Sequence, residues 1–184
     1  MKFQLRIIDQ DDWRELLKLI SSNYERLKTY FPQTVAAIVD EESTKTYVNK
    51  KVQDAANKVS LFHVITDSES AKIVGCIHVK EIDWNVPKAE LSYFIDQSVE
   101  GKGIISKYLK EVVRNCFEHT GLEKVFVRIN PENAASKKVA LKCGFEKEGY
   151  FRCDFRSGEG ELKNSEYYGL LKSEFIITNT IMPI

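Results

Sequence analysis

The sequence predicts an α/β fold in which a mixed, mostly antiparallel sheet of about seven strands is flanked by helices. Runs that alternate apolar and polar residues recur along the chain, as half-buried strands require. A long segment after Gly103 instead repeats apolar residues at helical spacing, which is typical of an amphipathic helix. Short polar stretches, such as 67–70, join successive alternating runs and favour an antiparallel meander.

The first part of the chain is predicted to be one strand followed by helices. Residues 3–8 alternate as a strand does, and the acidic stretch 9–12 can cap a helix that continues through Ile20. Residues 24–47 are less regular, because two aromatic residues and Pro32 interrupt the pattern. A second helix is predicted over 43–57.

The rest of the chain is predicted to contain six strands and two helices. The helices run from Gly103 to a stop at Gly121 and from Asn133 to Gly144. A polar stretch containing two glycines joins the last two strands as a flexible hairpin. The predicted strands cover residues 60–66, 72–82, 88–96, 124–130, 146–156 and 162–177.

Length and composition bound the class of protein. The 184 residues suit a single domain spanning 1–184, because domains commonly contain about 100–200 residues. A formal net charge of zero argues against nucleic acid as a direct partner, and no apolar run approaches the roughly 20 residues that cross a bilayer. The N-terminus lacks the apolar core of a signal peptide, so we expect a cytoplasmic protein. The four cysteines lack metal-ligand spacing, so we expect reduced core thiols and no metal site.

The stretch between residues 88 and 104 predicts an anion-binding loop. A predicted strand is followed by Gly101 and Gly103 and then by the long helix. Glycines let backbone N–H groups approach an anion closely, and the first turn of a helix offers unpaired donors at its positive end. Nucleotide-binding patterns fit poorly, because there is no Walker loop and Ser106 stands where a dinucleotide fingerprint needs a third glycine.

Two linked motifs resemble those of the Gcn5-related N-acetyltransferase (GNAT) superfamily. The first, Q/R-x-x-G-x-G/A, binds the coenzyme A pyrophosphate; here it falls on residues 100–105, where Glu100 and Ile105 depart from it and G-K-G-I is intact. The second is N-P-E-N-A-A-S-K-K-V-A-L-K-C-G-F, with Asn133 at the helix start and Ser136 three residues later. Two motifs in the right order are more specific than either alone.

The resemblance implies the GNAT fold, acetyl-CoA as the cosubstrate and a primary amine as the acceptor. Three features are most similar to the Rim-type ribosomal-protein N-terminal acetyltransferases: the strand A-E-L-S-Y-F-I-D, the Asn133 and Ser136 pair, and the late E-Y-Y-G-L-L-K-S-E-F run. The expected function is therefore acetylation of the N-terminal amine of a ribosomal protein. The alternatives are a small-amine (polyamine or antibiotic) acetyltransferase and a noncatalytic acyl-CoA sensor, because Ala140 replaces the tyrosine that many members use as the acid. A homodimer is also compatible with the resemblance.

The resemblance also implies which residues hold the coenzyme. If the strand over 88–96 splays from the strand over 124–130, its N–H groups can pair with pantetheine and polarise the thioester carbonyl. The expected coenzyme contacts are Phe94, Ile95, Gly101, Lys102, Gly103, Ile104, Ser106, Asn133 and Ser136.

Glu90 and Ser136 are the expected catalytic residues. Glu90 shares a strand face with Phe94 beside the expected thioester, so it can act as the general base, directly or through water. Binding the acceptor's ammonium without taking its proton is an equal alternative. Ser136 can protonate the leaving thiolate, or serve as a first-turn residue that bonds backbone or coenzyme. Tyr30 and Phe31 are candidate acceptor contacts or core residues.

Overall fold

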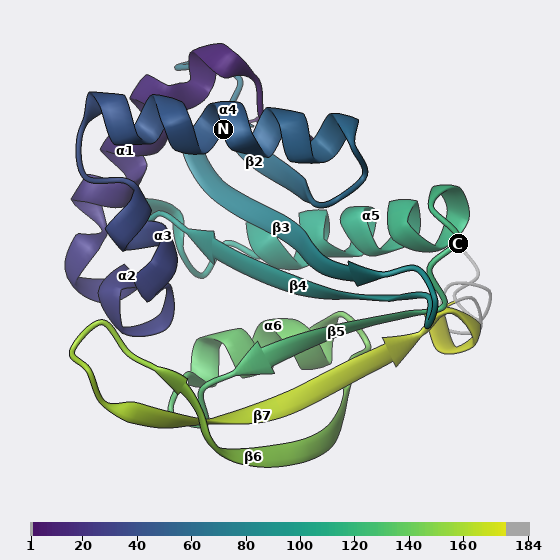
Figure 1. Cartoon of the computed structure of the whole chain (residues 1–184). Helices are drawn as coiled ribbons and strands as arrows, with labels where there is room; N and C mark the ends of the chain where they lie inside the picture. The colour runs from purple at the N-terminus through teal and green to yellow at the C-terminus, as the bar shows by residue number, and fades with distance from the viewer. Residues whose placement is uncertain (1, 176–184) are drawn as a thin grey trace.

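The computed structural model describes residues 2–175, and within them seven strands form one sheet (Figure 1). The strand order is β1-β2-β3-β4-β5-β7-β6. All neighbouring pairs are antiparallel except β4 and β5, which run parallel, so the predicted mixed, mostly antiparallel sheet is confirmed. The strands are β1 (Phe3–Ile7), β2 (Leu61–Asp67), β3 (Ile73–Asp83), β4 (Lys88–Ile95), β5 (Lys124–Ile129), β6 (Glu146–Arg156) and β7 (Leu162–Leu171).

Helices cover both faces of the sheet. One buried cluster packs α1 to α4 against one face, and the other packs α5 and α6 against the opposite face. Figure 1 shows α4 in front of the sheet and α5 behind it. None of these helices, within residues 2–175, is long and apolar enough to cross a membrane. The helices are η1 (Gln10–Asp12), α1 (Trp13–Ser22), α2 (Tyr24–Tyr30), α3 (Pro32–Ala37), α4 (Glu41–Ala56), η2 (Gln97–Val99), α5 (Ile104–His119) and α6 (Ala134–Lys142).

Strand β4 divides its side chains between these two layers. Ala89, Leu91 and Tyr93 belong to the cluster beneath α5, whereas Phe94 belongs to the cluster beneath α1 to α4. Because side chains alternate along a strand, Glu90 lies on the same face as Phe94, as the sequence predicts. This alternation directs the Glu90 carboxylate away from α5 and toward the N-terminal helices.

Strands β4 and β5 separate after a short parallel contact. Their register pairs only residues 88–90 with 124–126. Figure 1 shows the two strands diverging beyond this point. From Leu91 onward, the described part of β4 therefore has no strand partner on this side, which leaves backbone groups available to a ligand. The splay on which the expected pantetheine contacts depend is therefore present.

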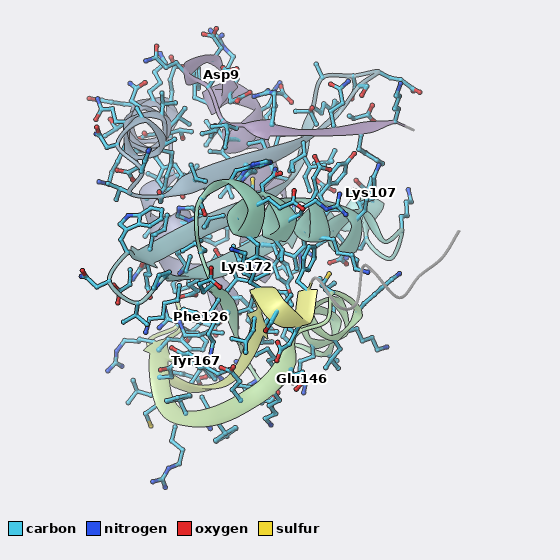
Figure 2. All side chains as sticks on the ribbon, turned by 90° about the vertical axis from the view of Figure 1, so that its right-hand side faces the viewer. Asp9, Lys107, Phe126, Glu146, Tyr167 and Lys172 are labelled. Carbon is cyan, nitrogen blue, oxygen red and sulfur yellow. The ribbon has the colours of Figure 1, made fainter. Side chains whose placement is uncertain are left out.

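Two predicted segments differ from the structure. Residues 24–47, predicted to be less regular, contain α2 and α3, because Pro32 occupies the start of α3, where its missing N–H costs nothing. The last strand, predicted to reach residue 177, ends at Leu171, and residues 172–175 are helical. The Leu171 N–H donates to Glu174 Oε2 at 2.8 Å, which favours this turn; Figure 2 shows it at Lys172. Residues 176–177 of that prediction lie outside the described residues.

Three of the four cysteines are buried, as the sequence predicts, but Cys153 is exposed. Cys153 has a φ of 53° and lies in β6, where the register with β7 shifts between Phe151 and Phe155. An irregularity of this kind re-aims the side chains of the strand. The prediction of a core thiol is therefore wrong at this position.

Candidate active site

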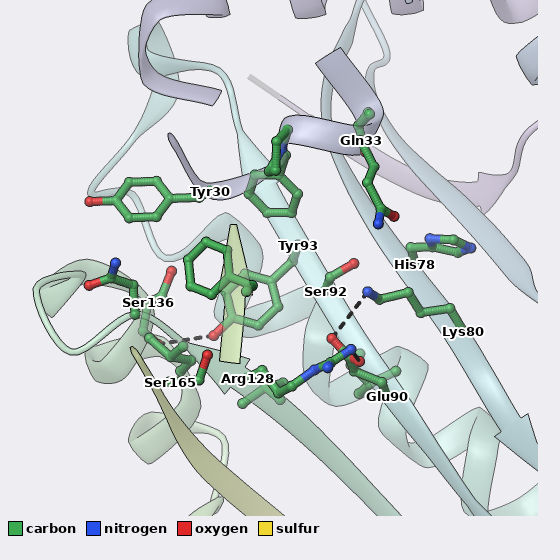
Figure 3. A pocket seen from close by; sticks show the side chains of 18 of the residues that line it. Tyr30, Gln33, His78, Lys80, Glu90, Ser92, Tyr93, Arg128, Ser136 and Ser165 are labelled. Carbon is green, nitrogen blue, oxygen red and sulfur yellow. Dashed lines mark hydrogen bonds and ion pairs between the residues drawn. The ribbon is translucent and has the colours of Figure 1, made fainter. Parts of the chain in front are cut away.

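A cavity of about 820 Å³ lies where β4 and β5 separate. Its walls come from residues 30–36, from β3, β4 and β5, from part of β6, and from the start of α6 (Figure 3). Three expected site residues, Glu90, Asn133 and Ser136, line it. The expected coenzyme contacts between residues 94 and 106 are not part of its lining, so the candidate site has two parts.

Both aromatic residues proposed as acceptor contacts border the cavity. Tyr30 lies at its edge (Figure 3), and Phe31 also lines it. Phe31 packs against Phe94 as well, with 5.3 Å between the ring centroids. Phe31 therefore combines the two alternatives, because it is both part of the core packing and part of the cavity wall.

The glycine loop before α5 has the geometry of an anion-binding site. Gly101 and Gly103 have φ values of 73° and 74°, in the left-handed region that favours glycine. The first hydrogen bond of α5 runs from the Lys107 N–H to the Gly103 carbonyl, at 3.0 Å. The N–H groups of residues 104–106 therefore have no carbonyl partner within the helix. A Cβ on Gly103 would lie 4.0 Å from Lys142 Nζ, so α6 brings an ammonium to the loop. Backbone donors and a cation together suit a pyrophosphate.

Two other expected coenzyme residues lie in or just after this loop. Lys102 is exposed at the loop surface. Ser106 is buried, and its carbonyl accepts the Cys143 thiol with Sγ 3.5 Å away. Because the N–H of Ser106 is in the first turn of α5, it is the group of this buried residue that a coenzyme at the helix start would meet.

The carboxylate of Glu100, which departs from the family pattern, is held by Arg26 of α2. Arg26 also donates to Asn23 Oδ1 at 3.0 Å and to the carbonyl of Ile95. A guanidinium bonded to the carboxylate offsets its charge next to the loop. An acidic residue at this position is therefore compatible with an anion nearby.

Two hydroxyl groups lie at the start of α6, that of Ser136 in its first turn and that of Tyr93 from β4. Asn133 caps this helix, because its Oδ1 accepts the Ser136 N–H at 3.0 Å. The Tyr93 hydroxyl donates to the Ser136 carbonyl at 3.0 Å (Figure 3). Burial raises the pKa of Tyr93, so its phenol stays protonated near neutral pH. The sequence analysis missed Tyr93, because strand alternation predicts which face of the sheet the side chain lies on but not that its hydroxyl contacts a residue 43 positions later.

Ala140 stands where many family members carry a tyrosine, and it is fully buried. Its carbonyl accepts the Phe145 N–H at 3.1 Å, which closes the helix at the Gly-Phe pair. Ala140 can supply no proton, so any acid in this region must be another group, such as the hydroxyl of Ser136.

Glu90 is buried and paired with two cations. One carboxylate oxygen, Oε1, lies 3.1 Å from Lys80 Nζ, and the other, Oε2, accepts a hydrogen bond from Arg128. Arg128 also donates to Glu81 Oε1 at 2.9 Å. Both oxygens of Glu90 are thus engaged by cationic donors, one by Lys80 and the other by Arg128. This geometry favours a positioning role for Glu90 over the role of general base.

Asp154 is a further carboxylate of the cavity, and the sequence analysis missed it. It lies on β6 where the strand loses its regular register, beside Cys153. Its Oδ2 is buried and has no hydrogen-bond partner among the described residues. A buried carboxylate oxygen without a donor is suited to receive an ammonium or its proton. Strand alternation could not find it, because the irregularity in β6 decides where the side chain points.

His78 lines the cavity next to Lys80 (Figure 3). Burial, together with the positive charges of Lys51 and Lys80, lowers its pKa to about 3. The imidazole is therefore neutral near pH 7 and too weakly basic to keep a proton there. It was not predicted as a site residue, because a lone histidine in a strand carries no specific pattern.

The splayed strands, the glycine loop at a helix start and the adjoining cavity define an N-acyltransferase fold. Residues 2–146 match the family model described as the acetyltransferase (GNAT) domain, so the chain belongs to this family and is an acetyltransferase.

Named relatives support the same class. An uncharacterized N-acetyltransferase of Bacillus subtilis is 25% identical, over 93% of this chain and 94% of the relative. The ribosomal-protein-serine acetyltransferase of Escherichia coli is 26% identical, over 79% and 80%. The spermidine N(1)-acetyltransferase of Escherichia coli is 24% identical, over 83% and 77%. The chain is thus similar both to enzymes named for protein acceptors and to one named for a polyamine.

Solved structures share the fold. The ribosomal-protein-S5-alanine acetyltransferase of Vibrio fischeri superposes with a TM-score of 0.88 at 20% identity, covering 95% of this chain and 96% of that one. A ribosomal L7/L12 α-N-protein acetyltransferase in complex with coenzyme A superposes with a TM-score of 0.84 at 20% identity, covering 93% and 94%. The fold expected from the sequence is confirmed.

Proposed function

We propose that this protein transfers the acetyl group of acetyl-CoA to the N-terminal amine of a protein, with ribosomal proteins as the leading class. The observation that carries the proposal is the separation of β4 and β5 beside a cavity lined with carboxylates. The similarity to the ribosomal-protein-serine acetyltransferase supports the acceptor class. A cytoplasmic location fits such an acceptor.

The coenzyme would lie across the first part of the site. Its pyrophosphate would meet the amides of the loop at 101–104 and the ammonium of Lys142. Pantetheine would follow the unpaired edge of β4, where the backbone of Phe94 and Ile95 is the expected contact. N–H groups on this edge would also polarise the thioester carbonyl, which lowers the cost of the developing oxyanion.

The acceptor amine would enter from the cavity. A peptide α-amine has a reference pKa of about 7.7–8.0, so part of it is neutral near pH 7 and it asks little of a base. We assign the proton of the ammonium form to the Asp154 carboxylate, through water, and the positioning of the amine to Glu90. The amine nitrogen then bonds to the thioester carbon and releases its second proton to solvent as the carbon–sulfur bond breaks, so that a neutral amide forms. The leaving thiolate takes a proton from solvent, or from Ser136, whose hydroxyl is then restored by a proton from water.

The test is turnover of acetyl-CoA with peptide and small-amine acceptors, with the acetylated product identified by mass spectrometry. Acetylation of a peptide α-amine is the expected result, and failure to bind acetyl-CoA would contradict the proposal. Asp154→Asn should lower turnover by about 10²-fold, the usual scale for a proton-transfer group. Glu161→Gln on the same hairpin is the matched control, because Glu161 is exposed and does not line the cavity.

A small-amine acetyltransferase is the second candidate, supported by the similarity to the spermidine N(1)-acetyltransferase. In that case spermidine would be turned over faster than any peptide. The noncatalytic acyl-CoA sensor considered in the sequence analysis is disfavoured, because residues 2–146 match the family model of an acetyltransferase domain. Tight binding of acetyl-CoA without turnover of any acceptor would identify it.

A further inference from the structure

Positive side chains gather at one end of the cavity. Lys51 comes from α4, Lys80 from β3 and Arg128 from β5, and we call these three the cationic end. Figure 3 shows Lys80 at the right of the view, Ser136 at the left, and Arg128 extending from the centre toward Glu90. The cationic end therefore gathers three of the four cationic side chains in the cavity lining; the fourth, Arg156 of β6, donates to the Gly160 carbonyl.

The carboxylates at the cationic end are already paired. Arg128 bonds both Glu81 and Glu90, and Lys80 pairs with Glu90. Three cations thus face two carboxylates among the residues that line this end of the cavity. The cation left over is Lys51, because the lining carboxylates are held by the other two.

Lys51 is a largely buried ammonium with weak partners. Its side chain is 13% exposed, and its recorded ion pair, with Asp54, is long at 4.0 Å. Its Nζ lies 3.4 Å from His78 Nε2 and 5.2 Å from the centre of the Tyr47 ring. Burial lowers the pKa of Lys51, which reports the cost of keeping this charge away from water. An incoming carboxylate would offset that cost.

His78 cannot provide that negative charge. It is neutral near pH 7, and it packs against Phe62 with 5.1 Å between ring centroids. As a neutral imidazole it offers Lys51 at most one lone pair. The Lys51 ammonium therefore still has N–H groups that can donate hydrogen bonds to an anion in the cavity.

We propose that the cationic end binds a carboxylate of the acceptor, so that the preferred acceptor is a protein N-terminus followed closely by an acidic residue. This inference rests on the proposed function. The acceptor amine would lie toward Glu90 and Asp154, and the acidic side chain would reach Lys51 and Lys80. A polyamine is disfavoured, because its second ammonium would meet those two lysines. A free amino acid carries the same pair of groups, so it belongs in the test.

The test compares acceptors that differ in one charge. Peptides with Asp, Asn or Lys at the second and third positions, free glutamate and spermidine are offered to the full chain with saturating acetyl-CoA, and kcat/KM is measured by mass spectrometry of the product. The Asp peptide should exceed the Asn peptide by about tenfold, as one charge-assisted contact in a partly buried site allows. Lys51→Gln should bring that ratio close to one. Lys45→Gln, on the same helix but outside the cavity lining, should leave the ratio unchanged.

Each outcome separates the inference from the function on which it rests. Peptide turnover with no preference for Asp, or a preference that survives Lys51→Gln, would overturn the inference and leave the function. If free glutamate were turned over faster than every peptide, the binding of an acceptor carboxylate would be confirmed, and a protein N-terminus as the preferred acceptor would be refuted. Calorimetry with the coenzyme A-loaded protein repeats the peptide comparison without turnover. An inert protein that still prefers the Asp peptide would refute the enzymatic assignment alone.

Discussion

Removing Arg128 should destabilise the protein by leaving Glu90 buried with one cation instead of two. Loss of one partner of a buried ion pair usually costs about 3–5 kcal/mol. Arg128 is 27% exposed and Lys80 remains 3.1 Å from Glu90, so we expect Arg128→Met to cost about 2–3 kcal/mol. Domains commonly have about 5–15 kcal/mol of stability, so the variant should still fold.

The measurement is urea unfolding followed by tryptophan fluorescence, with equal slopes required for a valid comparison. Arg152→Met is the matched control, because Arg152 is exposed, and it should change the free energy of unfolding by no more than about 0.5 kcal/mol. Combining Arg128→Met with Glu90→Gln should cost less than the sum of the two single changes by at least about 1 kcal/mol. The reason is that Glu90→Gln removes the buried negative charge that Arg128→Met leaves with Lys80 as its one cation. Equal costs for Arg128→Met and the control, or strict additivity, would refute this account of the pair.

Three further predictions concern the loop, Glu90 and the thiols. Gly103→Val should weaken acetyl-CoA binding at least tenfold, because valine disfavours the left-handed φ of this position and its side chain would block the approach of the pyrophosphate to the backbone. Gly121→Val is the control, because Gly121 also has a left-handed φ but lies beyond the other end of α5, and this variant should bind acetyl-CoA normally. Glu90→Gln should lower turnover while calorimetry finds nearly unchanged acetyl-CoA affinity; an unaffected rate would remove Glu90 from the mechanism. Cys153 should react with a thiol reagent in the folded protein, whereas the three buried cysteines should react only after unfolding; four equally fast thiols would contradict the burial.

Local pattern predicted the elements that carry the coenzyme half of the site. The strand before the loop, the two left-handed glycines and the helix start at Asn133 each follow from a few neighbouring residues. Such signals depend on residues within one turn or one strand, so the predictions made from them do not require the tertiary contacts of the chain. The splay of β4 from β5 came from the resemblance and not from local pattern.

The acceptor half of the site could not be predicted in the same way. Lys51 and His78 are 27 residues apart, and Arg128 and Glu90 are 38 apart, so no local pattern links them. Asp154 lines the cavity from the part of β6 in which the register with β7 is irregular. A single sequence shows the charges but not which of them neutralise one another, and that pairing decides which group is left to act on a substrate.

Two of the departures from the family's motifs, Glu100 and Ala140, also show what a distant element contributes. Glu100 would repel a pyrophosphate if its charge were open to the loop, yet Arg26 holds it from a helix 74 residues earlier in the chain. Ala140 leaves the last turn of α6 without a phenol, whereas the Tyr93 phenol of β4 donates to the Ser136 carbonyl in the first turn of that helix. At Glu100, the cation that offsets the unusual charge comes from an element far away in the sequence. A motif with a changed residue is therefore weak evidence against activity, because a distant element can offset the change.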